Sequence, residues 1–152
     1  MTGSTNFQLS VTETGQQLST TTNSISVTFT PVDDALITVN KTINIQEYTP
    51  TGGQGANQII TLSDAIINAY GETDTIDTFY VYDSEGSAQA LVIDEPFTTP
   101  AGAQIILNSL TGTTVELQYT PVQYNNDDET FQFKVDGSDG LTSNDATITL
   151  SI

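Results

Sequence analysis

The chain has 152 residues and a formal net charge of −17, because 19 acidic residues stand against only two lysines. This charge argues against binding to nucleic-acid phosphates or to an anionic membrane surface. The sequence contains no cysteine and no histidine, which excludes disulfides, thiolate metal sites and histidine-based catalysis. The length allows one domain, with or without an additional arm.

The first predicted elements are two short strands within residues 1–34. In each of them apolar and polar residues alternate, with the apolar positions at Phe7, Leu9 and Val11 and at Ile25, Val27 and Phe29. The segment between them is rich in threonine, glutamine and serine. We therefore expect residues 1–34 to form an N-terminal β arm or hairpin that ends in a linker.

Residues 35–152 form the second predicted unit. Its first strand alternates, with Ile37, Val39, Ile43 and Ile45 expected on the buried face and Thr38, Asn40, Thr42 and Asn44 on the other. Residues 63–71 are the one helix candidate, because Ser63 could cap its start and Gly71 its end. Further strands are predicted at 77–82, 88–93, 103–108, 114–120, 129–136 and 145–152.

The faces of the last strands follow from their alternation. Phe131, Phe133 and Val135 should point into the core, and Gln132 and Lys134 should point outward. The acidic run at 125–129, Asn-Asn-Asp-Asp-Glu, is expected to be a solvated loop. Short strands repeated about every 8–12 residues, with turn signals between them, indicate an all-β sandwich with at most one short helix.

The end of the chain carries a recognisable pattern. Residues 117–152 contain Tyr-Thr-Pro, an acidic turn, the run Glu-Thr-Phe-Gln-Phe-Lys-Val-Asp-Gly and an alternating last strand. This pattern resembles the end of the cadherin-like, immunoglobulin-like repeats of bacterial surface adhesins, which also occur in phage virion proteins. Residues 30–36, Thr-Pro-Val-Asp-Asp-Ala-Leu, resemble the linker that joins such repeats. The resemblance implies an immunoglobulin-like β-sandwich at 35–152.

The same resemblance implies two calcium sites. One is an acidic loop formed by Glu72, Asp74 and Asp77, and the other is a linker site formed by Asp33, Asp34 and Glu47. Calcium takes about six to eight oxygen ligands, which carboxylates and backbone carbonyls supply. The alternative at both places is a polar turn or a solvated surface without metal. Asp136 and Asp139 lie in an Asp-Gly turn, which needs no metal.

Lys41 is in phase with the face of its strand that should be buried. Some immunoglobulin-like surface domains join a first-strand lysine to a last-strand asparagine through an isopeptide bond. Asn144 would be the partner of Lys41 if the first and last strands pair. The ordinary alternative is a lysine whose charged end reaches the solvent at the edge of the sheet.

Two functional interpretations remain open, and neither involves catalysis. The first is a phage virion surface component, favoured by an initial Met without a secretion signal, which docks on neighbouring structural subunits, including copies of itself. The second is a calcium-stiffened spacer repeat of a secreted adhesin at the bacterial cell surface. A subunit of an extracellular filament that exchanges its N-terminal strand is a further alternative. Weak binding to a cell-surface glycan is compatible with either location.

Overall fold

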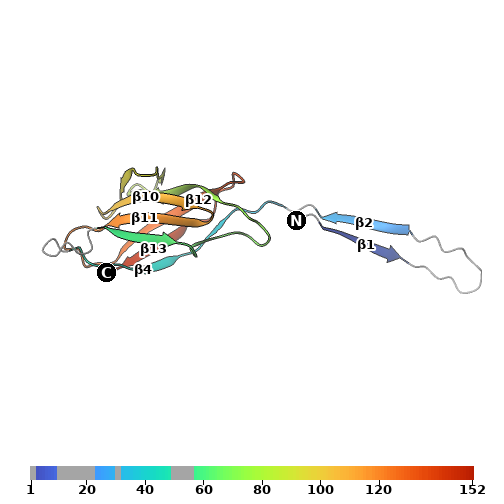
Figure 1. The fold of residues 1–152 in the computed structure, drawn as a ribbon, viewed down its shortest axis with the longest axis horizontal. Coiled ribbons are helices and arrows are strands. Elements are labelled where there is room, and N and C mark those ends of the chain that lie inside the picture. The colour runs from blue at the N-terminus through green and yellow to red at the C-terminus, as the bar shows by residue number, and fades with distance from the viewer. Residues whose placement is uncertain (1–2, 10–22, 30–31, 49–56) are drawn as a thin grey trace, which may run out of the picture. The chain divides into compact units, whose positions relative to one another are not determined.

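The computed structural model describes residues 3–9, 23–29, 32–48 and 57–152 (Figure 1). The chain divides into two compact units, Met1–Asp33 and Asp34–Ile152, one residue from the boundary expected from the sequence. The first unit holds the antiparallel pair β1 (Gly3–Leu9) and β2 (Asn23–Phe29). Among the described residues, no helix is long and apolar enough to cross a membrane.

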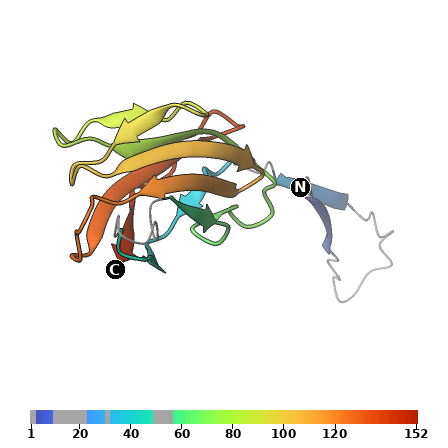
Figure 2. The same cartoon turned by 60° about the vertical axis from the view of Figure 1, so that its left-hand side comes forward.

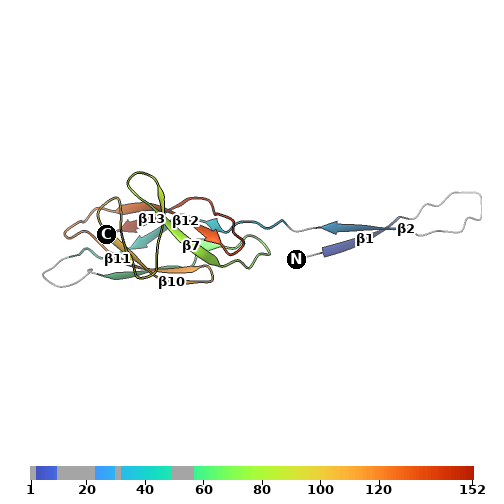
Figure 3. The ribbon, with the colours of Figure 1, turned by 90° about the horizontal axis from the view of Figure 1, so that it is seen from above.

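The second unit is an all-β sandwich, as predicted. A four-stranded sheet has the order β5-β11-β10-β9, and a five-stranded sheet has the order β4-β13-β12-β7-β8. The two sheets form two layers (Figures 2 and 3), and a short ribbon joins β3 to β6. The strands of this unit are β3 (Ile37–Thr38), β4 (Lys41–Asn44), β5 (Gln58–Leu62), β6 (Ile66–Ile67), β7 (Ile76–Tyr82), β8 (Ala88–Ala90), β9 (Pro96–Thr98), β10 (Gln104–Thr111), β11 (Thr114–Thr120), β12 (Glu129–Gly137) and β13 (Ala146–Ser151).

The core lies between the two layers and is built by alternation. Along β11, β12 and β13 every second residue is buried, and the residues between them are more exposed. The rings of Phe79 and Phe133 stack at the centre of the five-stranded sheet, with centroids 5.4 Å apart. The fully buried strand residues include Ile60, Leu62, Phe79, Val81, Ile105, Val115, Leu117, Tyr119, Phe133, Val135, Ile148 and Leu150.

The six strands predicted from residue 77 onward are confirmed, each to within three residues at either end. The inward positions Phe131, Phe133 and Val135 are buried and Gln132 is exposed, as alternation requires. The last strand, β13, pairs in parallel with β4, which places Lys41 opposite Ile148. The sequence did not predict β9, because its three residues are too few to show a period.

The helix predicted at 63–71 is wrong, because the described residues contain no helix and this segment contains β6. Ala65 and Ile66 are both fully buried, and the carbonyl of Ala65 accepts a hydrogen bond from the Val39 N–H. Tyr70, expected on the apolar side of the helix, is fully exposed. Pairing with β3 and burial of two successive side chains therefore outweigh a capping signal over nine residues.

The predicted faces of the first strand are also wrong in part. Thr38 is buried, with 3% of its surface exposed, whereas Ile37 and Val39 are exposed by 42% and 37%. The cause is a break in the strand, because β3 joins β6 while β4 joins the five-stranded sheet. Burial of Thr38 is possible because Asn144, 106 residues away, bonds both its N–H and its carbonyl. Ile43 and Ile45 pack against the core as expected.

Glu129 corrects the expectation of a solvated loop at 125–129. It begins β12 and is 97% buried, since only 3% of its surface is exposed. Its carboxylate accepts hydrogen bonds from the hydroxyls of Tyr119 and Thr99, and Thr99 Oγ in turn accepts the Ala103 N–H. The acid therefore links β11, β12 and the turn before β10. Burying a carboxylate is costly unless hydrogen bonds satisfy it, and here two hydroxyls do so.

Replacing Glu129 should test this network. We expect Glu129→Ala to lower the free energy of unfolding by about 3 kcal/mol, because it leaves a cavity and two buried hydroxyls without their acceptor. Glu129→Gln keeps the shape and one acceptor, so its loss should be about 1 kcal/mol. Asp127→Ala, an exposed acid in the same run, is the control and should stay within about 0.5 kcal/mol of the unmodified chain. Urea unfolding measures all three, and equal losses for the two alanine variants would disprove the role of Glu129.

Candidate functional site

The residues predicted to hold calcium fall in several places. Glu72 and Asp74 lie on the loop before β7, and their carboxylate oxygens come within 4.8 Å of each other. Asp77 is on β7 and is exposed. The linker residues divide between the units, because Asp33 ends the first unit and Asp34 begins the second. Glu47 follows β4 and is exposed.

The Glu72 loop is joined to the turn after β12. The hydroxyl of Ser138 donates to Asp74 Oδ1 at 3.3 Å and accepts the Thr75 N–H at 3.2 Å. The other carboxylate oxygen of Asp74 is buried and has no hydrogen-bond partner among the described residues, and the same holds for one oxygen of Asp139. Each of the two loops therefore carries an unsatisfied acidic oxygen.

Asp136 and Asp139 differ in their roles. Asp139 Oδ1 accepts the Leu141 N–H, which is the turn function predicted for it. Asp136 instead lies at the end of β12 and accepts from the hydroxyls of Tyr80 and Thr142, at 2.7 Å and 2.6 Å. No local pattern in the sequence indicates these hydroxyl contacts, because Tyr80 is 56 residues from Asp136.

The structure does not bring Lys41 and Asn144 together. Lys41 Nζ lies 2.5 Å from Asp64 Oδ2, and the two side chains are 32% and 65% exposed. The Lys41 ammonium, by its hydrogen bond, lowers the pKa of the Asp64 carboxyl. Asn144 uses its amide on the backbone of Thr38 instead. The lysine therefore reaches toward solvent at the edge of the sheet and has an acidic partner there.

The outer face of the five-stranded sheet carries an organised group of polar and aromatic side chains. Tyr80 and Tyr82 alternate along β7, and their hydroxyls donate to Asp136 and Asp145. Lys134, on the neighbouring strand β12, places its Nζ 5.6 Å and 5.8 Å from the two ring centroids, within the range of a cation–π contact. The two carboxylates therefore hold the tyrosine hydroxyls, and the lysine lies against both rings.

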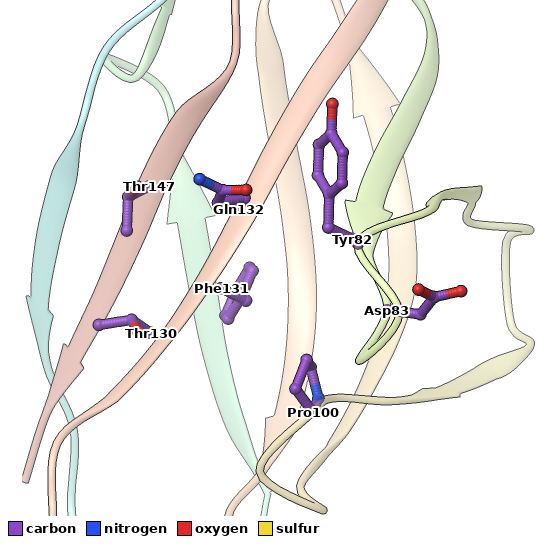
Figure 4. Close-up of a pocket in the computed structure, with 8 residues that line it drawn as sticks. Tyr82, Asp83, Pro100, Thr130, Phe131, Gln132 and Thr147 are labelled. Atoms are coloured by element: carbon purple, nitrogen blue, oxygen red, sulfur yellow. The ribbon is translucent and has the colours of Figure 1, made fainter.

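A pocket of about 330 Å³ is lined in part by residues of this face (Figure 4). Tyr82, Asp83 and Gly86 contribute from the end of β7 and the turn that follows it, and Pro100 contributes from the turn between β9 and β10. The remaining lining residues belong to β12 and β13, namely Thr130, Phe131, Gln132 and Thr147. The sequence predicts that Gln132 and Lys134 point outward, but it contains no signal for a pocket on this face.

Comparisons with known proteins identify no family. No protein-family description matches the chain, and no curated protein matches it. Among solved structures, the chain is similar to an endo-fucoidan hydrolase of glycoside hydrolase family 107, at 15% identity and a TM-score of 0.42. That match covers 99% of this chain and 22% of the hydrolase. A similarity this low supports no conclusion about fold or activity, so the function must be argued from the residues.

The hydrogen bonds of the three tyrosines, one in the core and two on the outer face, can be tested by varying the pH. Burial, and secondarily the bond to Glu129, raises the pKa of Tyr119. The hydrogen bonds to Asp136 and Asp145 raise the pKa values of Tyr80 and Tyr82. Folding therefore favours the protonated phenols, and the stability they contribute is full below the pKa of an unfolded tyrosine, about 10, and is lost as the pH rises above it.

We expect the free energy of unfolding to fall as the pH rises above about 10, and Tyr119→Phe to make that fall shallower. Urea unfolding over a pH series measures this, and the ultraviolet absorbance of tyrosinate reports ionisation directly. Tyr70→Phe is the control, because Tyr70 is fully exposed, and it should leave the slope unchanged. The same slope in all three proteins would contradict the assignment.

Proposed function

We propose that this chain is a non-catalytic structural subunit of a surface assembly, most simply the surface of a phage virion. In this proposal the immunoglobulin-like sandwich is the displayed module and the N-terminal hairpin docks on a neighbouring subunit. The observation that carries the proposal is the register of β1 and β2, which separates polar from apolar residues.

Residues that face each other across antiparallel strands lie on the same side of the sheet. The register pairs Phe7 with Ile25, and the same face holds Leu9, Val27 and Phe29 together with Gly3, Thr5 and Asn23. The other face contains only polar residues, which are Ser4, Asn6, Gln8, Ser24, Ser26 and Thr28. The apolar residues of the ribbon therefore all belong to one face, which also holds Thr5 and Asn23.

A two-stranded hairpin is at best marginally stable in water and becomes stable when its apolar face is covered. The distribution of charge along the chain favours the hairpin of a second copy as the surface that covers this apolar face. Residues 34–152 hold 17 of the 19 acids and both lysines, a net charge of −15, whereas residues 1–33 hold two acids and no lysine, a charge of −2. Two sandwiches repel each other far more than two hairpins do. The hairpins of two copies therefore pack with their apolar faces together.

A pair of double variants tests this docking. Phe7→Thr with Ile25→Thr makes the apolar face polar while keeping residues that suit strands. We expect it to abolish the concentration-dependent association of the full chain, because the surface that two copies bury is lost. Sedimentation equilibrium over a wide concentration range measures the association constant.

The matched control is Asn6→Thr with Ser26→Thr, the adjacent cross-strand pair on the polar face, which should associate like the unmodified chain. The proposal fails if the unmodified chain is monomeric at every concentration, since its hairpin is then covered within one molecule. It fails equally if the two double variants associate alike.

A calcium-stiffened spacer repeat is the second candidate, and the unpartnered oxygens of Asp74 and Asp139 favour it. Glu72 and Asp74 could supply the first two carboxylates, and the loop that bears Asp139 is tied to Asp74 through Ser138. Carboxylate and hydroxyl oxygens suit calcium. A bound cation would satisfy oxygens that no protein donor reaches.

Thermal melts in millimolar calcium and in chelator test this candidate. If calcium binds only the folded chain, a concentration 100 times the dissociation constant adds about 2.7 kcal/mol of stability, a shift of several degrees. Asp74→Asn should lose most of that shift, and Asp127→Asn, an exposed acid, should keep it. The same shift in both variants, or with magnesium in place of calcium, would point to general screening of the acidic surface and would rule out the site.

A further inference from the structure

The pocket on the five-stranded sheet has fixed walls. Asp83 Oδ1 accepts the N–H groups of Glu85 and Ser87, and its Oδ2 accepts from the Gln89 amide. These hydrogen bonds, that from the Ser87 backbone first, lower the pKa of Asp83 and keep it ionised. Tyr82 is held by its hydroxyl on Asp145 at 2.6 Å. The groups on this side of the pocket are thus already engaged within the protein.

The opposite side of the pocket offers hydrogen-bonding groups that nothing uses. Gln132 and Thr147 are direct cross-strand partners on β12 and β13, and Thr130 lies two residues before Gln132 on the same face. Among the described residues, none of these three side chains has a hydrogen-bond partner. Together they present one amide and two hydroxyls, all neutral, each able to donate and to accept. Figure 4 shows them across the pocket from Tyr82 and Asp83.

The charges around the pocket restrict the chemical class of ligand that it can bind. No cationic side chain lines the pocket, and Lys134 lies against the rings of Tyr80 and Tyr82. The unit that carries the pocket has a net charge of −15, and Asp83 adds its negative charge at the rim, so an anionic ligand is repelled. The oxygens of Asp83 already accept three hydrogen bonds, which weakens their attraction for a cationic ligand.

We propose that this pocket binds one neutral sugar ring of a glycan. A neutral pyranose has hydroxyls that match Gln132, Thr130 and Thr147, and apolar C–H faces that can lie against the Tyr82 ring and Pro100. The volume, about 330 Å³, is at the small end of ligand sites, which suits a single sugar ring. Because the pocket is open on a sheet surface, binding is weak, with a dissociation constant on the order of millimolar.

Nuclear magnetic resonance of the isotope-labelled full chain tests this proposal. The probes are the methyl glycosides of glucose, galactose and mannose, with the methyl glycoside of glucuronic acid as an anionic sugar and sorbitol as an open-chain polyol. We expect at least one neutral methyl glycoside to shift the amide signals of Thr130, Gln132 and Thr147 in a saturable way. Sorbitol and the methyl glycoside of glucuronic acid should shift none of them.

Matched variants locate the site. Gln132→Ala should weaken binding about tenfold, because the amide makes the central contacts. Gln118→Ala is the control, since Gln118 also lies between two neighbouring strands, on β11 of the other sheet, and it should leave binding unchanged. Thr147→Val provides a second test in case Gln132→Ala disturbs the sheet, and it should also weaken binding.

The proposal is overturned if no neutral methyl glycoside gives saturable shifts, if the shifts map away from the pocket, or if only the glucuronic acid glycoside binds. Equal affinity in the Gln132 and Gln118 variants would overturn it as well. The pocket lies wholly within the second unit, so the titration can be repeated on the chain with the polar-for-apolar changes at Phe7 and Ile25. Sugar binding there, without association, separates this proposal from the docking of the hairpin.

Discussion

The shortage of cationic side chains governs how this protein satisfies its acids. With 19 carboxylates and two lysines, hardly any acid can form an ion pair, and the described residues contain one such pair, Lys41 with Asp64. Hydroxyl and amide groups donate in their place. Buried Glu129 is satisfied by Tyr119 and Thr99, and on the outer face Tyr80 bonds Asp136. Such bonds to an ionised acceptor are stronger than those between neutral groups.

This use of hydroxyls also organises the outer face of the five-stranded sheet. A tyrosine that donates to a carboxylate is held at its far end, and Lys134 holds the rings of Tyr80 and Tyr82 from the neighbouring strand. The tyrosines, Lys134 and Asp83 are engaged by one another, by other side chains or by backbone, whereas the side chains of Gln132 and Thr147, which face each other across β12 and β13, have no partner among the described residues. The outer face of the sheet thus has aromatic side chains held by hydrogen bonds beside neutral polar side chains, and the pocket is lined by both.

Alternation in the sequence was sufficient to predict the sandwich, because a strand with one buried face must alternate. It located the strands from residue 77 onward and the inward positions Phe131, Phe133 and Val135. It failed where a distant partner decides burial. Thr38 is buried because Asn144 satisfies it, and Glu129 because Tyr119 and Thr99 do. A pattern read over neighbouring residues contains no information about such partners, and for the same reason it could not locate the pocket.

The two units that the internal contacts define also differ clearly in net charge. The sandwich carries −15 and the hairpin unit −2, so copies that meet through their hairpins keep the repelling charge on the modules that they display. Salt at moderate concentration screens the repulsion between exposed charges more than about 10 Å apart, whereas hydrophobic association does not depend on that screening. In the assembly that we propose, apolar contact between hairpins is therefore the attractive force. A neutral sugar is the kind of ligand that can approach these crowded acidic modules without an electrostatic penalty.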